Sequence, residues 1–168
     1  MKLANQLNLQ GRVLLRHYDC DHNLLHEIDQ PNIITNTGRL FFAEKILDIA
    51  DTITVDKIGI GDGQTATSLD DTSLAAADSY GSGNYVYSSI RFKQVVDQTN
   101  KGFYVESIFS EGVYGGQLVA EIGLFSSEED PYTNEPTELI ARTVLSGGNQ
   151  FEKAASDYLS VAWNITLG

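Results

Sequence analysis

The chain has 168 residues, 42% of them hydrophobic and 20% charged, so it can bury a core without the help of a disulfide or a metal ion. Its 23 acidic and 11 basic residues give a formal net charge of −12, which disfavours binding to nucleic-acid phosphates and to anionic membranes. We therefore expect no direct nucleic-acid binding and no membrane association.

Cysteine usage and the first residues indicate where the chain is made. Cys20 is the single cysteine, so no intramolecular disulfide can form, and a reducing cytoplasm is the expected compartment of synthesis. Residues 1–9 lack an apolar run of signal-peptide length, and no stretch approaches the roughly 20 apolar residues of a membrane span.

The first elements along the chain are two short strands. Residues 11–17 alternate apolar and polar side chains, residues 24–28 follow, and the turn formers at 19–23 lie between them. This pattern predicts a β-hairpin, whose second strand Pro31 should limit or place at a sheet edge. We expect residues 1–36 to be an N-terminal hairpin or arm that packs on the body or reaches a neighbouring molecule.

One amphipathic helix is predicted at about residues 38–50, capped by Asn36 or Thr37. Its polar side carries Arg39, Glu44, Lys45 and Asp48. Its apolar side is formed by Leu40, Phe41, Ala43, Ile46, Leu47 and Ala50.

The rest of the chain has the period-two pattern of strands. Strands are predicted at residues 55–60, 85–96, 102–110, 118–125, 139–143 and 158–165, with polar loops at 64–83 and 126–136. In the last strand, a core face is predicted for Leu159, Val161, Trp163, Ile165 and Leu167. The expected fold is mainly β: an antiparallel β-sandwich, Ig-like or jelly-roll-like, whose body spans residues 37–168.

The hairpin holds every residue type that commonly binds zinc. His17, Cys20, His22 and His26 lie within ten positions, beside Asp19 and Asp21. The cluster has no paired motif such as CxxC, and neighbouring strand residues face opposite sides, so we interpret these residues as turn and strand residues.

Other candidate sites have weaker patterns. Residues 59–63 are glycine-rich but precede no helix that could hold a phosphate, and Asp62, Asp70, Asp71 and Asp78 fit no calcium loop. A nucleophile elbow is also missing. From these patterns together we expect no enzyme, no cofactor and no metal site. A sugar-stacking or partner-binding surface is the alternative to packing for Tyr80, Tyr85, Tyr87, Phe103, Tyr104, Tyr114 and Tyr132.

Several phrases resemble those of bacteriophage tail-associated virion proteins. They are Asn32 to Arg39, Ile58 to Gly63, Asp70 to Leu74, Glu121 to Phe125, Ala141 to Thr143, and Trp163 to Ile165. The resemblance covers roughly residues 32–167. It implies a non-enzymatic structural subunit of the tail, neck, collar or baseplate, in the virion, after assembly in the host cytoplasm.

The expected partners are other copies of the chain and other virion proteins, in a ring or as an adaptor. Two alternatives stay open, a capsid decoration or cement protein, and a carbohydrate- or receptor-binding module. An assembly subunit predicts self-association, whereas a binding module predicts an exposed aromatic cluster and measurable glycan binding.

Overall fold

The computed structural model describes residues 9–46, 54–78, 83–96, 102–132 and 135–167. The described chain is mainly β, with two short helices, α1 (Asn36–Ile46) and α2 (Ala75–Asp78). The strands are β1 (Leu9–Tyr18), β2 (Leu24–Ile34), β3 (Val55–Gly61), β4 (Tyr85–Ser89), β5 (Phe92–Val96), β6 (Gly102–Phe109), β7 (Gln117–Val119), β8 (Glu121–Ser126), β9 (Leu139–Val144), β10 (Phe151–Lys153) and β11 (Tyr158–Leu167).

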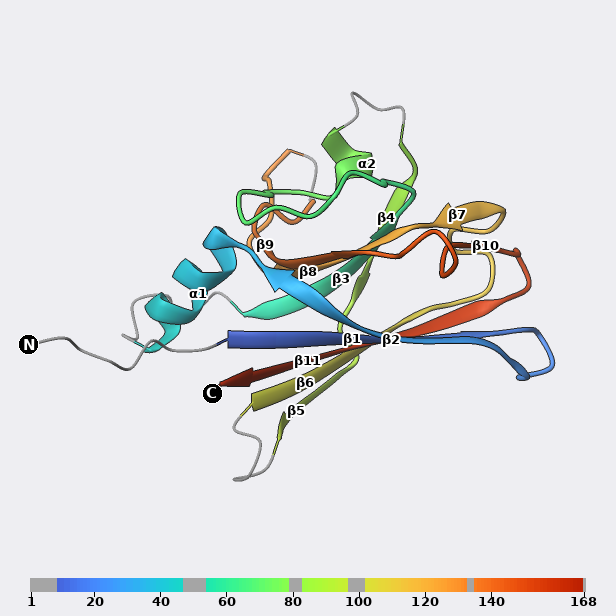
Figure 1. Ribbon diagram of the computed structural model, residues 1–168, viewed down its shortest axis with the longest axis horizontal. Coiled ribbons are helices and arrows are strands. Elements are labelled where there is room, and N and C mark those ends of the chain that lie inside the picture. The colour runs from blue at the N-terminus through green and yellow to red at the C-terminus, as the bar shows by residue number, and fades with distance from the viewer. Residues whose placement is uncertain (1–8, 47–53, 79–82, 97–101, 133–134, 168) are drawn as a thin grey trace, which may run out of the picture.

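Nine strands form one curled antiparallel sheet in the order β4-β3-β8-β9-β2-β1-β11-β6-β5. A separate two-stranded ribbon pairs β7 with β10. Figure 1 shows β8, β9 and β3 on one side of the β1–β2 hairpin, and β11, β6 and β5 on the other. The two-sheet sandwich expected from the sequence is not confirmed, because the nine strands are hydrogen-bonded in one continuous order.

The predicted N-terminal hairpin is confirmed as a hairpin, and it lies at the centre of the sheet. β1 pairs with β11 from Leu9 to Tyr18, and β2 pairs with β9 at Ile33 and Ile34. Val13 and Leu15 of β1 are at most 1% exposed. The hairpin therefore shares the core with the rest of the chain.

Pro31 does not end the second strand, because β2 continues to Ile34. Pro31 lies opposite Arg12 of β1, before β2 joins β9 at Ile33. The missing N–H of proline therefore falls where β2 has no partner on its β9 side.

The main core fills the concave side of the curled sheet. The predicted core face of the last strand is confirmed for four residues, since Leu159, Val161, Trp163 and Ile165 are fully buried; the side chain of Leu167 lies outside the described residues. Alternation along β3 and β8 also directs Ile58, Ile60, Ile122 and Leu124 into this core.

Two predicted strands are each divided by a bend. Residues 85–96 form β4, paired with β3, and β5, paired with β6, because the chain changes partner between Ile90 and Arg91. Residues 118–125 form β7 and β8, separated at Ala120, whose N–H bonds the carbonyl of Gly61. In both cases, one continuous apolar pattern in the sequence covers two strands that pair with different partner strands.

The helix α1 begins earlier than predicted and buries a different face. Thr35 caps it, because its hydroxyl accepts the N–H of Gly38 at 2.9 Å. Phe41 and Phe42 are buried, whereas Leu40, expected on the apolar side, is 59% exposed. Leu47 and Ala50 lie outside the described residues. The buried positions follow the spacing Gly38, Phe41, Phe42, which is the i, i+3, i+4 pattern of one helix face.

The convex side of β3, β8 and β9 is covered by residues 62–78, here named the covering segment, which include α2 (Figure 1). Leu74 of this segment packs with Phe125 and Leu139 in a second, smaller core. Gly123 leaves the necessary space, since a Cβ there would lie 2.7 Å from Phe125 and 2.9 Å from Leu74. The sheet therefore has a buried surface on both of its faces in this region.

Candidate interaction groove

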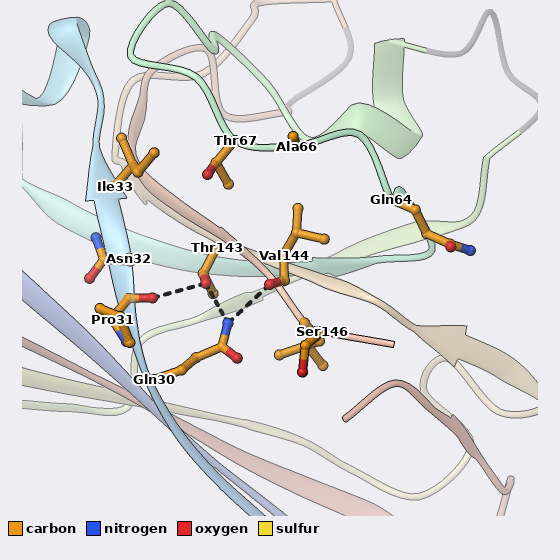
Figure 2. A pocket seen from close by; sticks show the side chains of 11 residues that line it. Gln30, Pro31, Asn32, Ile33, Gln64, Ala66, Thr67, Thr143, Val144 and Ser146 are labelled. Atoms are coloured by element: carbon orange, nitrogen blue, oxygen red, sulfur yellow. Dashed lines mark hydrogen bonds between the residues drawn. The ribbon is translucent and has the colours of Figure 1, made fainter. Parts of the chain in front are cut away.

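A groove of about 650 Å³ lies between β2, β9 and the covering segment (Figure 2). None of its eleven lining residues carries a charge, although the chain as a whole has a net charge of −12. The lining residues are Gln30, Pro31, Asn32, Ile33, Gln64, Ala66, Thr67, Thr143, Val144, Leu145 and Ser146.

The groove opens where β2 and β9 diverge. The two strands pair at Ile33 and Ile34 of β2. Nearer the start of β2, side chains bridge the gap between the strands. The Gln30 amide donates to Thr143 Oγ1 at 2.5 Å and to the carbonyl of Val144 at 3.1 Å. The Thr143 hydroxyl in turn donates to the carbonyl of Pro31 at 3.1 Å (Figure 2). These bonds link the two strands across the gap between them.

The opposite wall of the groove is the covering segment, which a buried arginine holds in place. Arg142 of β9 is 1% exposed and donates to Asp71 Oδ2 at 2.8 Å and to the carbonyl of Thr65 at 2.9 Å. Its Nε donates to Glu121 Oε2 of β8, also at 2.8 Å. Arg142 therefore ties the wall of the groove to two strands of the sheet.

Glu121 is fully buried, and its carboxylate is completely occupied by donors. Besides Arg142, it accepts the N–H groups of Ala75 and Ala76 at 3.0 and 2.8 Å, at the start of α2. Backbone donors and a guanidinium together satisfy a buried carboxylate that would otherwise be strongly unfavourable. Gly61 is needed beside it, because a Cβ there would lie 2.9 Å from Glu121 Oε1.

A second connection joins the covering segment to the start of α1. The Asn36 amide donates to Asp70 Oδ1 at 2.8 Å, and the Asn36 N–H donates to the carbonyl of Leu69 at the same distance. Thr35 donates its hydroxyl to the carbonyl of Leu139 in β9. The wall of the groove is thus anchored at both of its ends.

The fold brings only His17 and His26 of the hairpin cluster together, with their ring centroids 5.5 Å apart. His17 is buried on the concave face, while Cys20 and His22 lie at the exposed turn, where His22 bonds the Tyr158 hydroxyl. His26 stacks beside Phe151. Within the described residues, no group of three or more His, Cys, Asp or Glu side chains is placed to hold a metal ion.

The aspartates weighed as calcium ligands also separate. Asp62 bonds Asn84, Asp70 bonds Asn36, and Asp71 bonds Arg142. The side chain of Asp78 lies outside the described residues. Each of the first three carboxylates therefore serves as a separate structural connection.

Most of the aromatic set is used in packing. Tyr87 lies edge-on to Phe125, and Tyr85 packs against the same small core. Phe103 packs against the main core, and the Tyr114 hydroxyl lies 2.7 Å from the carbonyl of Asn84, where burial raises the Tyr114 pKa. Tyr104 pairs with Phe92, and Tyr132 is 92% exposed. Tyr80 lies outside the described residues.

One buried polar cluster was not predicted from the sequence. His17 Nε2 lies 2.7 Å from Asp157 Oδ2, and the ring stacks on Phe151 of the β7–β10 ribbon. Burial lowers the His17 pKa, partly opposed by the bond to Asp157, and burial also lowers the pKa of the neighbouring Lys153. No sequence signal could have paired His17 with Asp157, because 140 positions separate them.

The groove offers uncharged hydrogen-bonding and apolar groups, which suit a polypeptide segment better than a charged small molecule.

Within the described residues, no helix is long and apolar enough to cross a membrane. Comparisons with protein-family models, curated proteins and solved structures found no match to this chain.

Proposed function

We propose that the chain is a non-enzymatic structural subunit of a bacteriophage virion, in the tail, neck, collar or baseplate region. In this role it acts as a ring subunit or an adaptor through protein–protein contacts. The proposal rests on the phrases that resemble phage tail-associated proteins, and on how these phrases are used in the fold.

The observation that carries the proposal is that four of these six phrases, far apart in the sequence, form one connected network. Asn36 of the first phrase bonds Asp70, and the neighbouring Asp71 bonds Arg142. Arg142 bonds Glu121, which opens the phrase of β8. The phrases that carry the resemblance therefore hold together a scaffold and one wall of the groove, which supports the role of a building block.

The β-sandwich belongs to the same proposal. Its support is that β2 pairs mainly with β1 and then joins β9 at Ile33, while the chain from β4 to β5 changes partner from β3 to β6. Two crossing segments of this kind would allow the curled sheet to form the two facing layers of a sandwich.

The test is recovery of the chain from particles. Virions produced by the strain that encodes the chain are purified on a density gradient, washed in high salt, and quantified by mass spectrometry. We expect several copies of the chain per particle. A chain that stays in the unassembled fraction would overturn the proposal. The control adds purified, isotope-labelled chain to finished particles, which measures non-specific adsorption.

A further inference from the structure

The uncharged groove is unusual on a chain with a net charge of −12. Two copies of such a chain repel one another wherever their acidic surfaces face each other. The groove is a surface that a second copy can approach without apposing carboxylates. Its accessible apolar contribution comes from Pro31, Ile33, Ala66 and Val144.

A second exposed apolar site belongs to the tip of the β1–β2 hairpin, and this tip lies at the far right of Figure 1. Leu24 and Leu25 are 50% and 47% exposed there. The register shifts between His17 and Tyr18, so that Leu25 is the extra residue of a β-bulge. Bulges redirect side chains, and the two adjacent leucines give the hairpin tip an exposed apolar surface.

Two of the three acidic side chains around this tip have partners within the hairpin, and the third, Asp21, is exposed. Asp19 accepts the N–H groups of Asp21 and Asn23 and the side-chain amide of Asn23. Glu27 pairs with Arg16 at 2.8 Å. The two leucines can therefore enter an uncharged groove while these polar groups stay at its rim.

The tip cannot reach the groove of its own chain. Leu25 and Gln30 belong to the same strand, β2, and five residues of extended strand separate them by about 16 Å. β2 is paired with β1 through this stretch, so it cannot fold back. An occupant provided by this tip must come from another molecule.

We propose that the hairpin tip of one copy, Leu24 and Leu25, docks in the groove of a second copy. The inference rests on the proposed function, since it names the self-contact of such a subunit. Tip and groove are different surfaces, so the contact is head-to-tail, and it extends to a ring if the rotation closes or to a filament if it does not.

The experiment compares two single variants with the wild type by sedimentation velocity at low and high salt. Leu25→Arg alters the tip, and Ala66→Arg alters the groove; both lower the net negative charge, so added repulsion cannot explain a loss of association. We expect the wild type to self-associate, more strongly at high salt because salt screens like charges. Each variant should associate at least about tenfold more weakly, because a buried leucine contact is lost or obstructed.

Mixing the two variants is the decisive measurement. The Leu25→Arg copy keeps an intact groove, and the Ala66→Arg copy keeps an intact tip, so a 1:1 mixture should form a heterodimer and nothing larger. Leu40→Arg, at an exposed leucine outside both surfaces, is the matched control and should associate as the wild type does. Circular dichroism checks that every variant is folded, and Leu24→Arg with Ser146→Arg repeats the test at neighbouring positions.

A wild type that is monomeric at both salt concentrations overturns the inference, as does a mixture without heterodimer. Loss of association in the Leu40→Arg control also contradicts it. If self-association fails but the chain is found in purified particles, the docking inference fails and the proposed function stands. If the chain self-associates as described but is absent from purified particles, the docking inference stands and the proposed function fails.

Discussion

Arg142 and Glu121 form an ion pair inside the protein, with Arg142 Nε 2.8 Å from Glu121 Oε2 and both side chains at most 1% exposed. The pair joins β8 and β9 and, through Asp71 and Thr65, holds the wall of the groove. Both charged side chains are removed from water. The loss of one partner therefore leaves an uncompensated buried charge.

Replacing Arg142 with Met should therefore lower the free energy of unfolding by about 3–5 kcal/mol. Urea denaturation followed by circular dichroism measures the change. Arg12→Met is the matched control, because Arg12 pairs with Asp29 at an exposed site. Exposed pairs contribute at most about 1 kcal/mol, so similar losses in the two variants would contradict the role assigned to Arg142.

Gly123 is expected to tolerate no side chain, because the covering segment packs directly on it. In Gly123→Ala the new Cβ would lie within 3.0 Å of Phe125, Leu74 and Leu139, and the overpacking should destabilise the protein by about 1–3 kcal/mol. Gly148→Ala is the control, since a Cβ there meets nothing within 4 Å. Thermal unfolding of both variants should separate them, and an unchanged melting temperature for Gly123→Ala would be inconsistent with the second core.

Stability should fall as the pH is lowered from 8 to 5.5, in part because of His17. Burial lowers the His17 pKa in the folded state, so the unfolded chain binds more protons below the ordinary histidine value of about 6.5. The contribution of neutral His17 to the free energy of unfolding is therefore present above pH 6.5 and is lost as the pH falls through the lowered pKa of the folded state. A single site can add a slope of at most about 1.4 kcal/mol per pH unit.

His17→Gln should flatten this pH dependence of the free energy of unfolding, measured by urea denaturation at several pH values. His22→Gln serves as the control, because His22 lies at the exposed hairpin turn. We expect the control to keep the slope of the wild type. A slope that survives in His17→Gln would mean that groups other than His17 determine the pH dependence.

Removing residues 1–30 should prevent cooperative folding, because β1 and most of β2 lie inside the sheet. The deletion exposes the inner edge of β11 and takes Val13 and Leu15 from the core. Circular dichroism and urea denaturation of the truncated chain should show no cooperative transition. A truncated chain that unfolds cooperatively would support the alternative that residues 1–36 form a separate arm.

Local patterns in the sequence predicted the elements that depend on alternation alone. The hairpin and the core face of the last strand follow from it, since a strand places every second side chain on one face whatever its partner is. The helix was predicted less well. Its apolar residues fit more than one face, and only packing against the sheet decides that Phe41 and Phe42 face inward while Leu40 does not.

The groove could not be predicted, because it combines short segments of β2, β9 and the covering segment that are distant in the sequence. The same holds for Arg142 and Glu121, which are 21 positions apart on neighbouring strands, and for His17 and Asp157. The amino-acid sequence by itself determined the mainly β character, the acidic charge and the faces of individual strands. Tertiary structure alone decided which strands pair, where they bend, and which polar groups meet in the interior, because these depend on the register between segments that no local pattern records.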